Sequence, residues 1–210
     1  QKGIKRLCIG MVNTQLPFMY GDAEVSPELY DIIIDDPQYY NPLFATPRQP
    51  VSVADFMIGL HISTLIKDGG TLQIGIGALG DAIAYGLGLR HNKNEAYTKL
   101  IDASGIAAAY GPLIRQIGGT DTFAEGIYGS TEMLVDGFLQ LYKCGVIKRK
   151  VYHHIGIQRL VNEGNLKDSI PADILKQMID QETINPYLTR KEFEALKRFG
   201  VFKEEVSYVD

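Results

Sequence analysis

The sequence predicts a layered α/β fold with a mainly parallel sheet, followed by a small helical appendage. Short apolar segments rich in β-formers alternate with segments of helical spacing, which is typical of α/β domains. Glycine turns separate the two kinds of segment. Towards the end, charged segments with helical period replace the apolar ones. We therefore expect an incomplete α/β domain over residues 1–157 and a helical insertion or linker region over 158–210.

Two strands are expected near the start of the chain. Residues 4–12 are apolar and rich in β-formers, which predicts a buried strand, and residues 30–34 predict a second one. Between them, residues 13–21 contain proline and glycine and are expected to form a loop. Four prolines within residues 35–50 predict an extended connector to the next element.

The central part of the chain predicts a helix, a strand, a glycine turn and a second helix. Ser52 is followed three residues later by Asp55, a variant capping box that predicts the start of an amphipathic helix over 53–67. Residues 71–76 predict an interior strand, because they are almost continuously apolar. Residues 77–80 predict a tight turn, and residues 81–89 predict the beginning of the second helix.

Weaker patterns follow. Residues 99–101 are a candidate strand, residues 131–144 predict a helix with one apolar stripe, and residues 146–157 are another candidate strand. Residues 171–178 and 189–199 predict short, charged amphipathic helices.

Composition excludes several functional classes. The net charge of −4 gives no basic surface for nucleic acid, and no apolar run approaches the roughly 20 residues that span a bilayer. Cys8 and Cys144 lie among apolar residues, which predicts buried free thiols. The histidines show no metal-ligand spacing. These observations favour a cytoplasmic protein that binds neither metal, nucleic acid nor membrane.

The first candidate site is the glycine motif GxGxxG at residues 75–80, between the predicted strand and the second helix. In this context it is compatible with a dinucleotide site of an NAD-dependent oxidoreductase, with Asp102 as the acidic ribose partner. The charge of Asp81 would oppose a pyrophosphate there. The alternatives are a tight structural turn, or a turn that lets an acyl or pantetheine chain approach the backbone.

The second candidate site is Glu132, at the start of the helix predicted over 131–144. Free N–H groups and the helix dipole favour an ionised carboxylate in such a place, and a nucleophile has to be ionised. The structural alternative is that Ser130 or Thr131 caps the helix and Glu132 is an ordinary early-turn residue.

Three segments, in this order, carry a resemblance to a known family. They are residues 12–25 (VNTQLPFMYGDAEV), 67–87 (KDGGTLQIGIGALGDAIAYGL) and 126–146 (GIYGSTEMLVDGFLQLYKCGV). Together they resemble the acetyl-CoA hydrolase/transferase family, which belongs to the family I CoA-transferases. The resemblance implies a sheet of the CoA-transferase type in two similar α/β halves. It also implies transfer of coenzyme A from an acyl-CoA to a small carboxylic acid, or hydrolysis of a short acyl-CoA.

Under this resemblance the site residues follow one by one. Glu132 matches the catalytic glutamate that forms a glutamyl-CoA thioester. The residues that match substrate-binding positions are Gln73, Gly75 and Gly77 in the strand and turn, and Asn13 and Gln15 in the loop after the first strand. Coenzyme A is then a substrate, no cofactor is needed, and a homo-oligomer is an open alternative.

Departures from the family pattern leave a further alternative open. Ala78 and Gly80 stand where the family is expected to have glycine and proline. The glycine-rich loop of the family's other half is not found after Glu132, so we expect an internal fragment of a longer homologue. A non-catalytic domain of the same fold is therefore a second alternative to the transferase.

Overall fold

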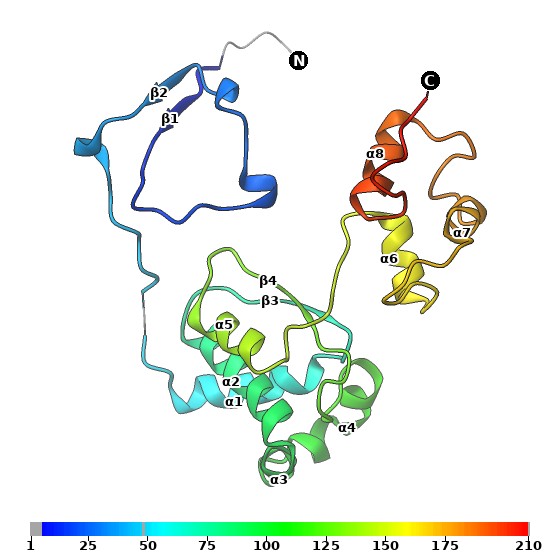
Figure 1. Cartoon of the computed structure of the whole chain (residues 1–210). Helices are drawn as coiled ribbons and strands as arrows, with labels where there is room; N and C mark the ends of the chain where they lie inside the picture. Colours follow the sequence, from blue (N-terminus) through cyan, green and yellow to red (C-terminus); the bar gives the residue numbers. More distant parts are fainter. Residues whose placement is uncertain (1–5, 48, 210) are drawn as a thin grey trace.

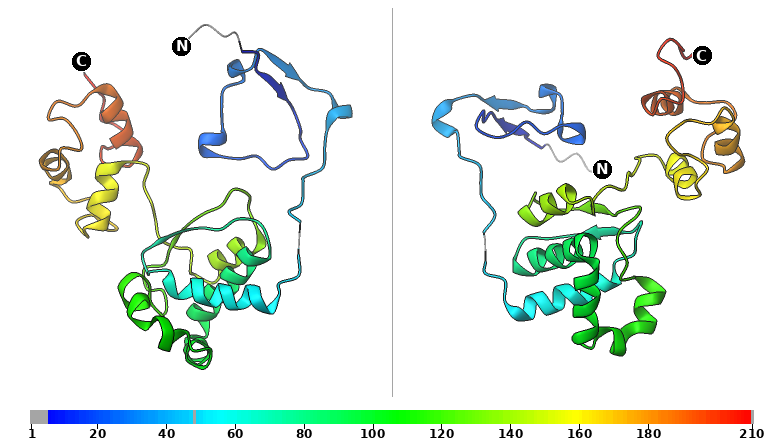
Figure 2. Two further views of the ribbon diagram at one scale, coloured as in Figure 1. Left: turned by 180° about the vertical axis from the view of Figure 1, so that it is seen from behind. Right: turned by 60° about the horizontal axis from the view of Figure 1, so that its bottom comes forward.

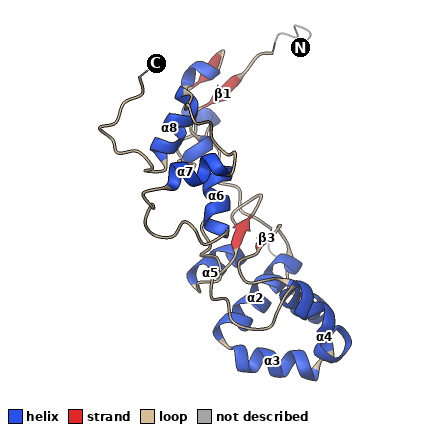
Figure 3. Cartoon of the chain, turned by 90° about the vertical axis from the view of Figure 1, so that its right-hand side faces the viewer, coloured by secondary structure: helices blue, strands red, loops and turns tan. Residues whose placement is uncertain are grey.

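The computed structural model describes residues 6–47 and 49–209 of the 210-residue chain. Figure 1 shows three regions in chain order: an N-terminal segment (6–47), a central region (52–150) and a C-terminal helical region (152–209). Helices make up most of the regular structure and the strands are short (Figure 3). The architecture is mixed α/β with small parallel sheets. No helix in the described parts of the chain has both the length and the apolar character of a transmembrane segment.

The N-terminal segment contains the two predicted strands, but they are not buried. β1 (Ile9–Met11) pairs in parallel with β2 (Ile32–Ile34), and the loop between them and the connector after them carry short 3-10 turns. Ile9 is 53% exposed and Met11 52% exposed, because no helix of the described residues covers either face of this two-stranded sheet. The prediction of a buried strand is therefore wrong, and so is that of a buried thiol at Cys8, which is exposed. Residues 4 and 5 of that predicted strand lie outside the described part of the chain.

The central region begins with the predicted capped helix. In α1 (Val53–Leu65) the N–H of Asp55 donates to Ser52 Oγ over 3.1 Å, and the N–H of Ser52 donates to Asp55 Oδ2 over 2.9 Å, which confirms the capping box. α2 (Ala78–Asn92) crosses α1 closely at Gly59, where a Cβ atom would lie 2.6 Å from the carbonyl oxygen of Ala82. The two helices pack through small residues, which explains their closeness.

The second sheet also has only two strands. β3 (Thr71–Gln73) pairs in parallel with β4 (Tyr128–Ser130), with Gln73 opposite Ser130, and a single bridge joins Ile127 to Ile147. β3 therefore lies at an edge, with both its end residues exposed, and the prediction of an interior strand is wrong. The buried apolar residue of this segment is Ile74, just beyond the end of the strand.

Two predicted strands are absent from this region. Residues 99–101 lie inside α3 (Asn94–Ala103), where Tyr97 and Ile101, four residues apart, bury one helical face. Residues 146–157 contribute only the bridge at Ile147, and α6 (Ile155–Asn162) begins before the segment ends. In both places a short apolar run suits a helix or a loop as well as a strand.

Two hydrophobic clusters hold the central region together. One lies between α2 and the β3–β4 sheet, and is built from Ile74, Leu87, Phe123, Ile127, Leu141 and Val146 with neighbouring residues. The other joins α1, α3 and α4 (Ile106–Ile117). Helix α4 thus accounts for most of residues 103–119, a segment rich in glycine and alanine.

Arg90 of α2 is the largest polar side chain buried in this region. It is 2% exposed, and its guanidinium lies 4.3 Å from the centre of the Phe123 ring. It donates to the carbonyl oxygens of Ser63 (2.9 Å) and Ile66 (2.6 Å) at the end of α1, and to that of Asp121 (2.7 Å). These carbonyls would otherwise lack partners, so Arg90 completes the C-terminus of α1.

The C-terminal helical region has a hydrophobic cluster of its own. α6, α7 (Ile174–Asp180) and α8 (Arg190–Arg198) surround a core that includes Leu160, Met178 and Leu196. Thr189 forms a capping box at the start of α8. The two charged helices predicted here are confirmed. Figure 2 shows this region beside the central one, connected by the segment after α5 (Asp136–Lys143).

Candidate active site

Two loops leave the β3–β4 sheet at the edge formed by the carboxyl ends of its strands. Because the strands are parallel and Gln73 is opposite Ser130, their carboxyl ends lie side by side. The N–H of Ile74 donates to the carbonyl oxygen of Ser130 over 3.0 Å, which extends the pairing by one residue. The glycine motif follows β3 and Glu132 follows β4, so the fold brings the two candidate sites of the sequence to one edge. In open α/β sheets this is the edge at which ligands bind.

The three glycines of the motif differ in their surroundings. A Cβ atom on Gly80 would lie 2.5 Å from the carbonyl oxygen of Gly75, so Gly80 is needed for close packing of helix on loop. Gly77 has φ +122° and caps α2. A Cβ atom on Gly75 or Gly77 would meet nothing within 4 Å. The predicted turn over 77–80 is therefore too long, since α2 begins at Ala78, and the space beside Gly75 and Gly77 is open.

Glu132 lies in a loop and not in a helix. α5 (Asp136–Lys143) begins four residues later, so the predicted helix start at 131 is wrong. The hydroxyl of Thr131 donates to the carbonyl oxygen of Met133 over 2.5 Å, which closes a local turn and leaves no hydroxyl cap for a helix here. Glu132 is exposed. The predicted stabilisation of its charge by free N–H groups and the dipole of a helix start therefore does not apply. The carboxylate is accessible because the loop exposes it to water.

Packing behind the loop fixes its direction. A Cβ atom on Gly129 of β4 would lie 2.7 Å from the ring of Phe138 in α5, and one on Gly137 would lie 2.9 Å from the Cβ of Ala84 in α2. α5 thus sits against both β4 and α2, and the loop that carries Glu132 is held at both ends. Positions 129 and 137 have to be small for this arrangement.

A small cleft opens beside the two loops. Its volume is about 260 Å³, and it is lined by Ile76 and Gly77 of the glycine turn, Val135 and Asp136 at the start of α5, Asp81 of α2, and three residues of the connector before α1. The described residues that line it do not include Glu132, which precedes Val135 by three positions. The cleft could hold an extended chain against the turn, but its two carboxylates disfavour a phosphate.

The other predicted binding residues lie in two places. Gln73 is exposed at the end of β3, on the edge just described. Asn13 and Gln15 lie in the N-terminal segment, where Asn13 Nδ2 donates to the carbonyl oxygen of Asn41 (2.8 Å) and Asn13 Oδ1 accepts from the N–H of Gln15 (3.0 Å). Both hydrogen bonds lie within the N-terminal segment.

Asp68, which follows α1, is a positioning residue that the sequence analysis did not identify. Its carboxylate accepts hydrogen bonds from the backbone N–H groups of Ala124, Glu125 and Gly126 (2.9–3.1 Å), just before β4. Partial burial works to raise the pKa of Asp68, but these hydrogen bonds outweigh it and the pKa lies below its ordinary value. The only sequence signal was an acidic residue before two glycines.

In the described part of the chain, no group of three or more His, Cys, Asp or Glu side chains is arranged to hold a metal ion. Cys144 is a half-buried free thiol.

The chain is similar to part of a known enzyme. The chain is 29% identical over 150 residues to 4-hydroxybutyrate coenzyme A transferase of Clostridium kluyveri. The match includes 70% of this chain and 26% of that enzyme, so the chain spans about a quarter of its relative's length. A crystal structure of 4-hydroxybutyrate CoA-transferase from Porphyromonas gingivalis aligns with 67% of the chain and 26% of its own, at 24% identity and a TM-score of 0.42. No protein-family model matches.

The sequence match agrees with the resemblance carried by the three motifs. The chain is a distant homologue of one part of 4-hydroxybutyrate CoA-transferase.

Proposed function

We propose that this chain carries the nucleophile of a reaction that moves coenzyme A between an acyl-CoA and a small carboxylic acid. The observation that carries the proposal is the position of Glu132. It is exposed on a loop at the carboxyl edge of β4, next to the open glycine turn that follows β3. Distant homology to a CoA-transferase supports the same reading.

The chemistry begins with attack of the Glu132 carboxylate on the thioester carbonyl carbon. The C–S bond breaks, CoA leaves as the thiolate, and a mixed anhydride remains. The thiolate then attacks the carbonyl carbon of Glu132 and releases the first carboxylate, which gives a glutamyl-CoA thioester. The acceptor acid takes the CoA by the same steps in reverse order. Water in place of the acceptor would make the reaction a hydrolysis.

The residues around Glu132 suit this role in two ways. Gly75 and Gly77 leave space beside the backbone, so that a pantetheine chain could approach it closely. Gln73 at the end of β3 could orient the acyl group by hydrogen bonding. The oxyanion formed in each step requires fixed N–H donors, and the loss of one such donor typically slows catalysis about a hundredfold to a thousandfold.

The two alternatives find less support. A dinucleotide site needs an acidic residue after a strand, but Asp102 lies in α3, where no strand precedes it. A non-catalytic domain predicts Glu132 buried in an ordinary helix start, whereas Glu132 is exposed and outside any helix. We further propose that the residues after 157 are an addition to the CoA-transferase core. The C-terminal helical region, to which they belong, has a hydrophobic cluster of its own.

The test is to trap the thioester. The protein is incubated with an acyl-CoA and then reduced with borohydride, which converts a glutamyl-CoA thioester to an alcohol that mass spectrometry can locate. We expect the label at residue 132. Glu132→Gln should form no adduct, and Glu132→Asp should lose about a hundredfold in rate, because the attacking oxygen moves by about 1 Å.

Glu194→Gln, which removes an exposed carboxylate from α8, is the matched control and should label normally. If the unmodified protein forms no adduct, or if the adduct maps to another carboxylate, the proposal is wrong.

A further inference from the structure

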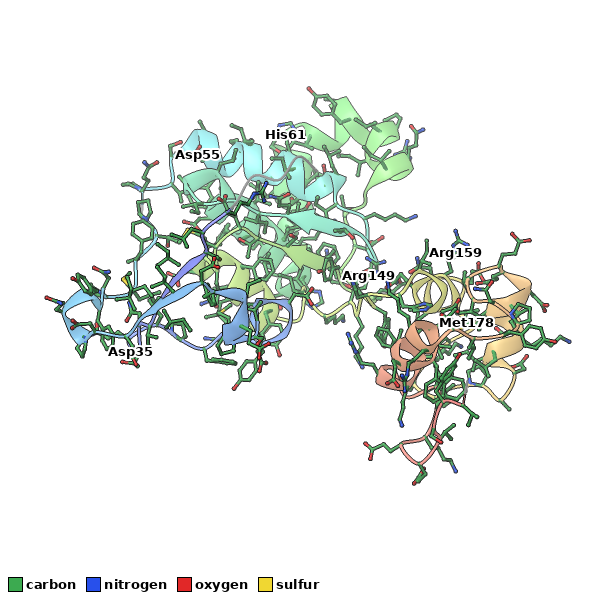
Figure 4. The ribbon with its side chains drawn as sticks, turned by 90° about the horizontal axis from the view of Figure 1, so that it is seen from above. Asp35, Asp55, His61, Arg149, Arg159 and Met178 are labelled. Atoms are coloured by element: carbon green, nitrogen blue, oxygen red, sulfur yellow. The ribbon has the colours of Figure 1, made fainter. Side chains whose placement is uncertain are left out.

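A large cleft lies at the other end of the β3–β4 sheet. It has a volume of about 1210 Å³ and opens between the central region and the C-terminal helical region. Gly69 and Gly70, which precede β3, form part of its wall, so it lies at the amino end of that strand. Figure 4 labels Arg149 at the junction of the two regions, where it lines this cleft. The cleft is distinct from the edge that carries Glu132.

The lining is basic although the chain is acidic. Five cationic side chains and three carboxylates line the cleft, a balance of +2, while the whole chain carries −4. Within residues 6–47 and 49–209, the single ion pair with nitrogen and oxygen within 4.0 Å joins Glu95 to Lys99, outside the cleft. Among these described residues, none of the five cations is therefore neutralised by a close carboxylate. These cations are Lys67, Lys148, Arg149, Lys150 and Lys167.

Two of the cations are fixed in the walls. Lys148 Nζ donates to the carbonyl oxygen of Phe123 over 3.2 Å. The Arg149 guanidinium donates to Thr71 Oγ1 (3.2 Å) in β3 and to Asn162 Oδ1 (3.5 Å) in α6. Their partners are neutral oxygens, so both positive charges remain uncompensated. Arg149 also links the two regions that form the walls.

The remaining three lysines have free ends. Lys67, Lys150 and Lys167 are exposed, and among the described residues their ammonium groups make no hydrogen bond or ion pair. Lys67 and Lys150 come from the central region, and Lys167 comes from the segment after α6. The cleft therefore has fixed cations in its walls and mobile cations from both sides.

Its negative charge is partly committed. The carboxylate of Asp68 already accepts hydrogen bonds from backbone N–H groups and does not face the cations as a free counter-ion. Glu125 and Asp168 contribute the other two carboxylates. Tyr152, Val161 and Leu166 add aromatic and apolar surface to the same lining.

We propose that this cleft binds a small molecule that carries a pyrophosphate group. Arginine and lysine are the residues that bind phosphate oxygens best, the former in a fixed planar geometry and the latter as a mobile point charge. The volume leaves room for an organic part beyond the phosphates, which the apolar portion of the lining would contact. A free nucleoside diphosphate and the diphosphate of a CoA ester share this chemistry.

The experiment is calorimetric titration of the whole protein with inorganic pyrophosphate at 0.15 M salt. We expect saturable binding with one site per chain. The triple variant Lys67→Gln, Lys150→Gln, Lys167→Gln should weaken binding at least tenfold without lowering the melting temperature, since the three side chains are exposed. ADP and CoA are then titrated separately, and the tighter ligand, which must compete with pyrophosphate, identifies the source of the diphosphate.

The control is a triple variant with the same change of charge outside the cleft, Lys143→Gln, Lys191→Gln, Lys203→Gln. It should bind pyrophosphate as the unmodified protein does. The proposal is overturned if pyrophosphate does not bind saturably, or if both triple variants lose the same affinity, because binding would then reflect net charge alone. The readout does not use CoA transfer, so this result is independent of the role of Glu132.

Discussion

The N-terminal segment and the central region begin from similar strands and differ completely in burial. β1 and β3 are both three-residue strands, each paired in parallel with one partner. No residue from 6 to 47 is buried, whereas Ile74, Leu87 and Ile127 around the second sheet are at most 3% exposed. The difference is that α2 covers the second sheet, whereas in the described part of the chain no helix covers the first (Figure 1).

An apolar run therefore determines a strand locally, but it does not determine whether that strand is buried. Burial requires a second layer that comes from elsewhere in the chain or from another chain. Stability in this protein should therefore be concentrated in the central region.

The largest contrast should come from trimming one side chain in each region. Leu87 is fully buried between α2 and the sheet, so Leu87→Ala should lower the free energy of unfolding by about 2–5 kcal/mol. Ile33 in β2 is 49% exposed, and Ile33→Ala should change it by no more than about 0.5 kcal/mol. Urea unfolding of both variants measures the difference. Equal effects would mean that the first sheet is covered in solution.

Replacing a glycine by alanine, which adds one methyl group, should give a smaller difference in stability between the two regions. Gly80→Ala places a Cβ atom 2.5 Å from a backbone oxygen and should cost about 1–3 kcal/mol. Gly10→Ala in β1 meets only the ring of Tyr30 at 2.9 Å, which can turn away, so the cost should be small. Thermal unfolding is the measurement.

A control in the same helix separates packing from helix propensity. A Cβ atom on Gly88 of α2 meets nothing within 4 Å, so Gly88→Ala should stabilise the protein by about 0.5–1 kcal/mol. If Gly80→Ala also stabilises the protein, the close approach of helix and loop is not present in solution.

The smallest effect should be a pH dependence from Asp68. Its folded-state pKa is lowered, so its contribution is present above the ordinary aspartate pKa of about 3.9 and is lost as the pH falls through the folded value. Asp68→Asn should lose about 1 kcal/mol at pH 7, and less at pH 3. Urea unfolding at both pH values checks this. A constant difference between protein and variant would contradict the assignment.

Asp31 provides the matched variant in the N-terminal segment. Its carboxylate accepts one backbone hydrogen bond, from the N–H of Cys8 over 2.8 Å, in exposed surroundings. Asp31→Asn should therefore leave unfolding nearly unchanged at either pH.

Local signals were predictable from the sequence, and non-local ones were not. The capping boxes at Ser52 and Thr189 depend on residues three positions apart, and both form as such a pattern predicts. The predicted helix start at 131 was wrong because the hydroxyl of Thr131 donates to the carbonyl oxygen of Met133 instead of capping a helix. The prediction of a strand over 99–101 was wrong because Ile101 packs with Tyr97 on one face of a helix.

The candidate site shows the same division. Motif order identified Glu132 and the glycine turn, but only the register of β3 with β4 brings them to one edge. The role of Asp68 depends on N–H groups more than 50 positions away in the chain, so local spacing could not reveal it. The basic cleft likewise combines side chains from three separate segments.

Arg90 has a consequence for how the central region opens. One guanidinium holds the last turn of α1 and the backbone at Asp121, and it lies against Phe123, whose ring belongs to the cluster under the sheet. None of these segments can separate from α2 without exposing carbonyl groups that have lost their donor. In hydrogen exchange, their amides should therefore become accessible together, as one cooperative unit, while those of β1 and β2 exchange earlier and independently.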